Sequence, residues 1–131
     1  MSVQALYLQK RMSAADAIRV VRNGETVVVP TGVGEPPSLL AALGEARRDF
    51  RDVTVAQLLP VRKYGYFDVE TAEHVRHTAY FFSGTSRPGG LEGWIDYLPA
   101  YFAELPTLIK RDLIPADVVF SIASPMDEHG Y

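Results

Sequence analysis

The sequence predicts an α/β protein: a three-layer α/β/α domain with a mainly parallel sheet and helices on both faces. Three observations predict this fold. Strand-like apolar runs alternate with helical patterns along the chain, which is typical of parallel sheets. The runs at 27–29 and 118–123 are apolar, as strands buried on both faces require. A glycine turn at 32–34 joins the first run to a helix.

The first helix is predicted to begin at Ser13, because Ser13 to Asp16 resembles a capping box with Asp in place of Glu or Gln. Residues 17–21 then give an apolar helical face, and Asn23-Gly24 ends it. A strand from Thr26 to Val29 follows.

The remaining elements follow from the same two periodicities. A helix is predicted from Pro37 to about Arg48, with Leu39, Leu40 and Leu43 facing inward. The other expected elements are a strand from Val53 to Leu59, a strand from Thr78 to Phe82, a helix within Tyr97 to Arg111, and a strand from Val118 to Ala123.

The turn between the first strand and the second helix is the candidate ligand site. Gly32 and Gly34 carry no Cβ, so the backbone can turn tightly and approach a ligand. Pro36 or Pro37 suits the first helical position. A helix N-terminus at the carboxyl end of a strand is where α/β sheets bind anionic or carbonyl-bearing ligands. A turn that needs glycine only for packing is the alternative.

The turn does not have the pattern of a nucleotide site. Proline stands at position 37 where a dinucleotide fingerprint needs its third glycine, and no Gly-Lys-Ser/Thr follows.

Composition limits the classes of function. The 131 residues suit a single domain, 1–131, with a real core. No cysteine is present, which excludes thiolate catalysis and cysteine-ligated metals. The net charge of −3 and the lack of a basic run argue against nucleic acid as a binding partner. No apolar run reaches membrane-spanning length and no signal-peptide core is seen, so a cytoplasmic location and no membrane partner are expected.

Several polar residues could carry chemistry. Glu35 could be a nucleophile, but a carboxylate that stabilises its own helix N-terminus is favoured. His74 and His77 could share a helical face as metal ligands, but a structural role is preferred and no metal is expected. His129 beside Asp127 and Glu128 is either an acid–base cluster or an Asp-capped turn. The aromatic residues Tyr64, Tyr66 and Phe67 either line a pocket or pack on the sheet.

Five segments carry a resemblance to a known family. They are Gly32-Val33-Gly34-Glu35-Pro36, Arg76-His77-Thr78-Ala79-Tyr80-Phe81, Asp96-Tyr97-Leu98-Pro99, Ile114-Pro115-Ala116-Asp117-Val118 and Ser124-Pro125-Met126-Asp127-Glu128-His129-Gly130-Tyr131. In this order they resemble the N-terminal part of the acetyl-CoA hydrolase/transferase family, which includes 4-hydroxybutyrate and succinate:acetate CoA-transferases. The terminal segment is the most specific of the five.

The resemblance implies a CoA-transferase-like fold and transfer of coenzyme A between small carboxylic acids. A glutamate forms an acyl anhydride and then a glutamyl-CoA thioester, and backbone N–H groups stabilise each oxyanion. The family's nucleophilic glutamate has no match here, so we expect no catalytic residue in this chain. The resemblance also implies that Gly32, Gly34 and Glu35 lie on the substrate and oxyanion side of the active site. It places Ser124, Asp127 and His129 in a loop near the cleft.

The resemblance also implies the partners. Acyl-CoA is a substrate rather than a tightly bound cofactor, small carboxylates are the other substrates, and a homo-oligomer is expected. We expect the chain to be the N-terminal portion of a longer protein, to be inactive alone, and to bind the missing C-terminal portion. Two alternatives stay open: a stand-alone phosphate- or ligand-binding domain of the sugar-phosphate isomerase type, and a non-catalytic subunit of a two-chain transferase.

Overall fold

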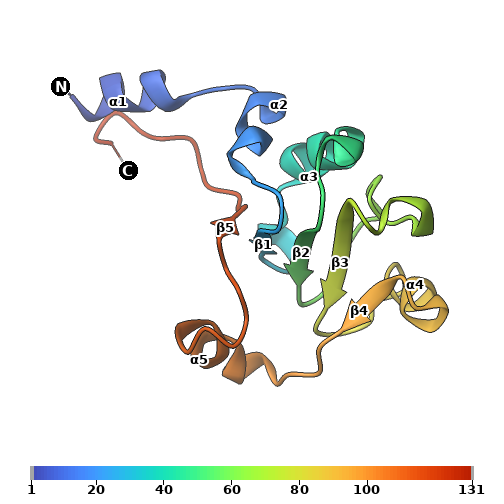
Figure 1. Cartoon of the computed structure of the whole chain (residues 1–131). Coiled ribbons are helices and arrows are strands. Elements are labelled where there is room, and N and C mark those ends of the chain that lie inside the picture. The colour runs from blue at the N-terminus through green and yellow to red at the C-terminus, as the bar shows by residue number, and fades with distance from the viewer. Residues whose placement is uncertain (1, 131) are drawn as a thin grey trace.

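The computed structural model describes residues 2–130 and contains one five-stranded sheet (Figure 1). The strand order is β4-β3-β2-β1-β5, and all four neighbouring pairs are parallel. The strands are β1 (Thr26–Val29), β2 (Val53–Gln57), β3 (Val75–Ala79), β4 (Ile95–Tyr97) and β5 (Val118–Val119). The predicted α/β class with a parallel sheet is therefore confirmed.

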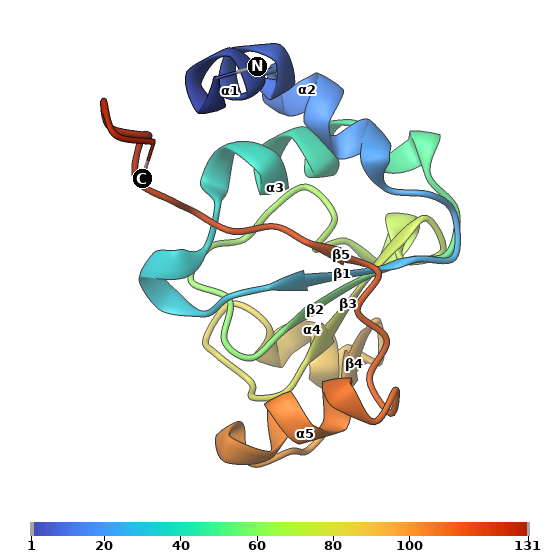
Figure 2. The same cartoon turned by 90° about the vertical axis from the view of Figure 1, so that its left-hand side faces the viewer.

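The helices cover both faces of the sheet (Figure 2). On one side lie α1 (Val3–Lys10), α2 (Ala14–Ala17) and α3 (Pro37–Glu45); on the other lies α5 (Leu105–Lys110), while α4 (Arg87–Glu92) packs beside β4. Short 3-10 turns are η1 (Ile18–Val20), η2 (Gly32–Gly34), η3 (Arg47–Asp49), η4 (Val69–Thr71) and η5 (Phe102–Glu104). The larger core fills the α3 side, and a smaller cluster around Tyr80 and Ile114 lies against α5. Within residues 2–130, no helix has the length and apolarity needed to cross a membrane.

Local sequence signals place several elements correctly. Ser13 caps α2, since its hydroxyl oxygen accepts the N–H of Asp16 at 3.1 Å. Gly24 has a φ of +80°, so the chain turns there as Asn23-Gly24 predicts. β1 has the predicted bounds, and Pro37 is the first residue of α3.

Two strands inside the sheet differ from their predicted bounds. β2 ends at Gln57 instead of Leu59, and β3 spans Val75–Ala79 instead of Thr78 to Phe82. The parallel register, which pairs Val53 with Val75, sets the start of β3. Val75, His77 and Ala79 are buried and the two residues between them are partly exposed, so the strand lies before the aromatic run and has the two-residue period of a sheet.

Three elements were not predicted from the sequence. They are α1, the short strand β4, and α4, whose sequence contains two glycines and a proline. Packing against Trp94 and Ile95 leaves no room for a side chain at Gly89, so tertiary contact overrides the low helix propensity.

The last strand is shorter than predicted. β5 has two residues and lies at the edge of the described sheet, where Val119 is exposed. The Val118 to Ala123 prediction was therefore wrong about length and burial. The chain nevertheless continues beside β1, because the N–H of Phe120 donates to the Val28 carbonyl at 3.1 Å.

Candidate functional site

The turn after β1 has the tight backbone that its glycines predict, although the two glycines act differently. Gly32 has a φ of +60°, a conformation that L side chains rarely adopt. At Gly34 a Cβ would lie 2.8 Å from Pro30 Cβ. Gly32 is therefore required by its dihedral angle and Gly34 by close packing.

Glu35 is the buried acid of this turn, with 5% of its surface exposed. Its Oε2 accepts hydrogen bonds from Gln57 Nε2 at 2.8 Å and from the Val61 N–H at 3.0 Å. Its Oε1 accepts the hydroxyl of Tyr64 at 2.5 Å. From the sequence we expected the Glu35 carboxylate to accept hydrogen bonds from the amides of the helix that it precedes. In the structure its donors all come from β2 and the loop after it.

These contacts join two loops at the carboxyl ends of β1 and β2. Burial and the bond to Glu35 raise the pKa of the Tyr64 phenol above its usual range, and the Arg62 guanidinium opposes this only weakly. Tyr64 therefore keeps its proton and donates a hydrogen bond to the carboxylate of Glu35. Gln57 adds a bond to the Pro30 carbonyl at 3.1 Å, so β2 also holds the start of the turn.

A cavity of about 420 Å³ lies beside this pair of loops. Gly32 and Val33 line it from the turn after β1, and Val61 and Arg62 line it from the loop after β2. Glu35, Pro37 and Ile122 complete its lining. It is a mainly apolar hollow with one guanidinium, at the edge of the sheet where α/β proteins bind ligands.

The amides of the turn are partly committed to the turn itself. Gly34 N–H donates to Thr31 O at 3.3 Å, and Glu35 N–H donates to Gly32 O at 3.2 Å. These two donors close the turn η2, so they are poor candidates for holding an oxyanion.

The aromatic loop after β2 packs inward. Tyr66 and Phe67 are buried and contact the ring of His77 at centroid distances of 6.4 and 4.6 Å. The sequence left open whether these aromatic residues line a pocket or pack on the sheet, and in the structure Tyr66 and Phe67 pack on the sheet. Of the three aromatic residues, Tyr64 is the one whose hydroxyl donates to Glu35 at the site.

His74 and His77 do not share a helix. His77 lies within β3, and His74 precedes the strand and contacts the Phe50 carbonyl through Nδ1 at 2.8 Å. Residues 2–130 contain no group of three or more His, Cys, Asp or Glu side chains placed to hold a metal ion.

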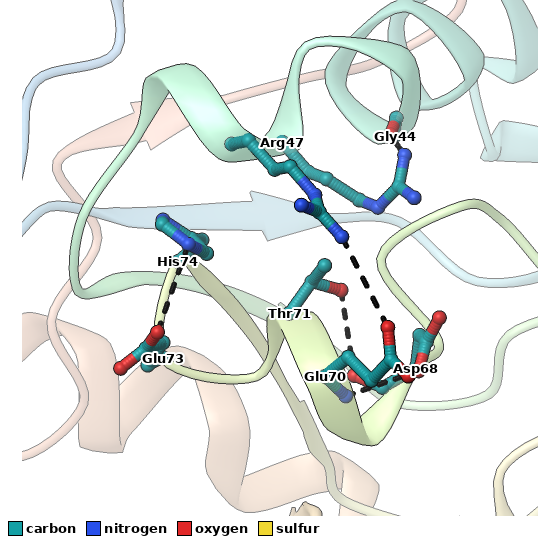
Figure 3. Close-up of polar contacts among 8 residues, drawn as sticks. Gly44, Arg47, Asp68, Glu70, Thr71, Glu73 and His74 are labelled. Carbon is teal, nitrogen blue, oxygen red and sulfur yellow. Dashed lines mark hydrogen bonds and ion pairs between the residues drawn. The ribbon is translucent and has the colours of Figure 1, made fainter.

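A second group of polar contacts lies at the amino ends of β2 and β3, at the edge away from the cavity (Figure 3). Arg47 donates to the Gly44 carbonyl, Asp68 accepts the Glu70 N–H, and Glu73 lies 3.8 Å from His74. The first two contacts cap the end of α3 and the start of η4, and the third joins the side chains of adjacent residues, so all three have a structural role.

The terminal segment leads away from the cavity toward α1. The N–H of Ile122, at the cavity, donates to Gly34 O at 3.4 Å. Ser124, Asp127 and His129 follow in an exposed stretch, and Glu128 O accepts from Gln4 Nε2 of α1 at 2.9 Å. Asp127 Oδ1 accepts the His129 N–H at 2.9 Å, which is an Asp-capped turn. Tyr131 of the terminal motif lies outside the described residues.

Sequence reasoning missed Gln57, Val61 and Arg62 as parts of the site. It named Tyr64 as a possible pocket residue but did not predict its hydrogen bond to Glu35. Only Gln57 left a signal, because a polar residue that ends an apolar strand needs a buried partner. The others are near Glu35 only through the parallel pairing of β1 with β2.

Comparison with known proteins gives one consistent result. The family model described as the acetyl-CoA hydrolase/transferase N-terminal domain matches residues 1–131. A succinyl-CoA:cyclohexane-1-carboxylate CoA transferase of Geobacter metallireducens is 39% identical over 99% of this chain and 29% of that protein. A 4-hydroxybutyrate coenzyme A transferase of Clostridium kluyveri is 30% identical over 100% of this chain and 30% of that protein.

Solved structures agree on the fold. RipA from Yersinia pestis has a TM-score of 0.84 at 26% identity, covering 99% of this chain and 32% of that one. A 4-hydroxybutyrate CoA-transferase from Porphyromonas gingivalis has a TM-score of 0.64 at 20% identity, covering 98% of this chain and 28% of that one. The chain thus spans under a third of the length of these relatives.

Proposed function

This chain belongs to the acetyl-CoA hydrolase/transferase family, as its N-terminal domain, and we propose that the whole protein transfers coenzyme A between carboxylic acids. The observation that carries this proposal is the family match over residues 1–131, together with relatives that are CoA-transferases. We propose residues 1–131 as a single domain of a longer, cytoplasmic, homo-oligomeric protein, with acyl-CoA as a substrate and no tightly bound cofactor.

The cavity beside the glycine turn is the proposed site for the acid. Its lining of Val33, Pro37, Val61 and Ile122 suits an apolar acyl body, and Arg62 is the cation beside it. The name of the Geobacter relative, which specifies cyclohexane-1-carboxylate, supports an acid with an apolar body. Gly32 and Gly34 let the turn approach that acyl group, with Glu35 behind them.

The covalent steps are assigned to a glutamate outside residues 1–131. Its carboxylate attacks the thioester carbonyl and expels the CoA thiolate, which leaves an acyl anhydride. The thiolate then attacks the glutamyl carbonyl and releases the first acid, and a second acid reverses the sequence. This domain supplies the walls of the acid site. Ser124, Asp127 and His129 lie outside the lining of this cavity, and we propose that they face a part of the cleft that the rest of the longer protein completes.

The test is transfer of CoA by the whole protein from succinyl-CoA to cyclohexanecarboxylate, 4-hydroxybutyrate or acetate, followed as new acyl-CoA. Omitting the acid separates transfer from hydrolysis. Arg62→Gln is expected to raise the KM for the acid about tenfold, as loss of a charge-assisted hydrogen bond would. Lys63→Gln, at the adjacent position outside the cavity lining, is the matched control. Absence of transfer to every acid would refute the proposal.

A further inference from the structure

We infer that Glu35 is a positioning residue whose buried carboxylate fixes the loop after β2, and so sets where Val61 and Arg62 stand at the cavity. The effect on acid selection rests on the proposed function, whereas the effect on the loop does not.

The first support is the number of donors that converge on one carboxylate. Glu35 accepts a backbone N–H, an amide N–H and a phenol O–H, and both of its oxygens are engaged. Only 5% of the surface of Glu35 is exposed, so its carboxylate requires such donors to replace the lost hydration. A nucleophile needs a lone pair directed at the substrate, whereas three of the roughly four acceptor positions of this carboxylate bind donors from β2 and the loop after it.

The second support is the location of the other contacts of this loop. Leu59 O accepts from Thr31 Oγ1 at 3.1 Å, and Pro60 O accepts from Thr85 Oγ1 at 3.1 Å. Farther on, Gly65 packs on Gly44 of α3, where an added Cβ would lie 2.8 Å from Gly44 O.

Glu35 holds the part between these two anchors. Its oxygens bind the N–H of Val61 and the side chain of Tyr64, which flank Arg62. The cavity wall formed by Val61 and Arg62 therefore depends on this carboxylate for its position relative to Gly32 and Val33. A shift of this wall changes the shape of the acid site while leaving a reacting group elsewhere in place.

The experiment compares four variants of the whole protein: Glu35→Gln, Glu35→Ala, Tyr64→Phe and the double variant Glu35→Ala/Tyr64→Phe. Hydrogen exchange of the Val61 amide reports the loop, and steady-state kinetics report KM for the acid and for acyl-CoA. Glu25→Gln is the matched control, because Glu25 also accepts a backbone N–H, from Arg22 at 2.8 Å, before β1 and away from the cavity.

We expect the Val61 amide to exchange about 10- to 100-fold faster in Glu35→Ala, the effect of losing a hydrogen bond to a charged acceptor. Glu35→Gln, which keeps a carbonyl acceptor, changes it less. The KM for the acid rises about tenfold in Glu35→Ala, more than kcat falls or the KM for acyl-CoA changes. Tyr64→Phe acts in the same direction, and the double variant is not additive because both changes break one network.

Three results would overturn the inference. Loss of all turnover in Glu35→Gln with unchanged Val61 exchange would make Glu35 a reacting group. Faster exchange with an unchanged KM for every acid would separate the loop from acid selection. Unchanged exchange in both Glu35→Ala and Tyr64→Phe would remove the role in the loop. If Glu35→Ala does not fold, Tyr64→Phe decides alone. If the wild-type protein transfers no CoA, the proposed function fails and the exchange data still decide the role of Glu35.

Discussion

At the scale of single residues, the core of this domain contains a buried histidine, His77. His77 is 1% exposed, contacts the rings of Tyr66 and Phe67, and has no hydrogen-bond partner at either ring nitrogen within residues 2–130. Burial lowers the pKa of His77 to about 3. The neutral ring is therefore part of the packed core.

His77 makes stability depend on pH. The unfolded chain binds this proton below about pH 6.5, whereas the folded chain binds it only near its lowered pKa of about 3. The unfolded state thus holds more protons between these values. The free energy of unfolding falls by about 1.4 kcal/mol per pH unit as the pH drops through this window.

Urea unfolding of the chain from pH 7 to pH 4 checks this dependence in the wild type and in His77→Phe. The variant should lose most of the slope between pH 6 and 4, and His129→Gln, at an exposed histidine, should keep it. Equal slopes in wild type and His77→Phe would contradict the prediction.

Gly32 gives a second prediction at this scale. Gly32→Val places a β-branched residue at a φ of +60°, which costs about 1–2 kcal/mol and shifts the turn that lines the cavity. Gly32→Asn should cost less, because asparagine tolerates this conformation. Thermal unfolding ranks the two variants, and an equal loss in both would mean that side-chain bulk matters and not the dihedral angle.

At the scale of elements, the helix α3 and the loop after β2 meet through two glycines. A Cβ on Gly44 would lie 2.8 Å from Gly65 N, so backbone contacts backbone at this point. The contact brings Tyr64 and Tyr66 to the face of the sheet under α3, where their rings stack with centroids 5.9 Å apart. The pairing of helix and loop thus determines which aromatics are buried.

Gly44→Ala is expected to destabilise the domain by about 1–3 kcal/mol, because backbone atoms on both sides must move apart. Gly84→Ala is the matched control, since a Cβ at Gly84 meets nothing within 4 Å. The difference in the midpoint of urea unfolding measures the effect. A Gly44→Ala variant as stable as Gly84→Ala would show that the helix and loop can separate without cost.

At the scale of the whole molecule, large apolar side chains remain exposed around the cavity edge of the sheet. Val33 is 99% exposed, Ile122 50% and Val119 64%, and the first two line the cavity. Exposed apolar groups that gather at a hollow mark binding surfaces. The chain spans under a third of the length of its relatives. We therefore propose that this apolar surface contacts the rest of the protein.

We therefore expect residues 1–131 alone to show no CoA transfer, and to recover it when co-expressed with the remaining portion of the family protein. Light scattering should detect the complex, or self-association of the isolated chain. Turnover by the isolated chain that disappears in Glu35→Gln would contradict this expectation and make Glu35 the nucleophile. A monomer that does not bind the remaining portion would contradict the proposed surface.

The sequence by itself determined the α/β class, the strand Thr26–Val29, the cap at Ser13, the start of α3 at Pro37 and the family. These depend on local periodicity, on capping chemistry and on motifs read along the chain. Tertiary structure alone decided the start of β3, the edge position of β5 and the partners of Glu35. The physical reason is that parallel pairing brings together residues from distant segments, so a carboxylate after one strand finds its donors after the next.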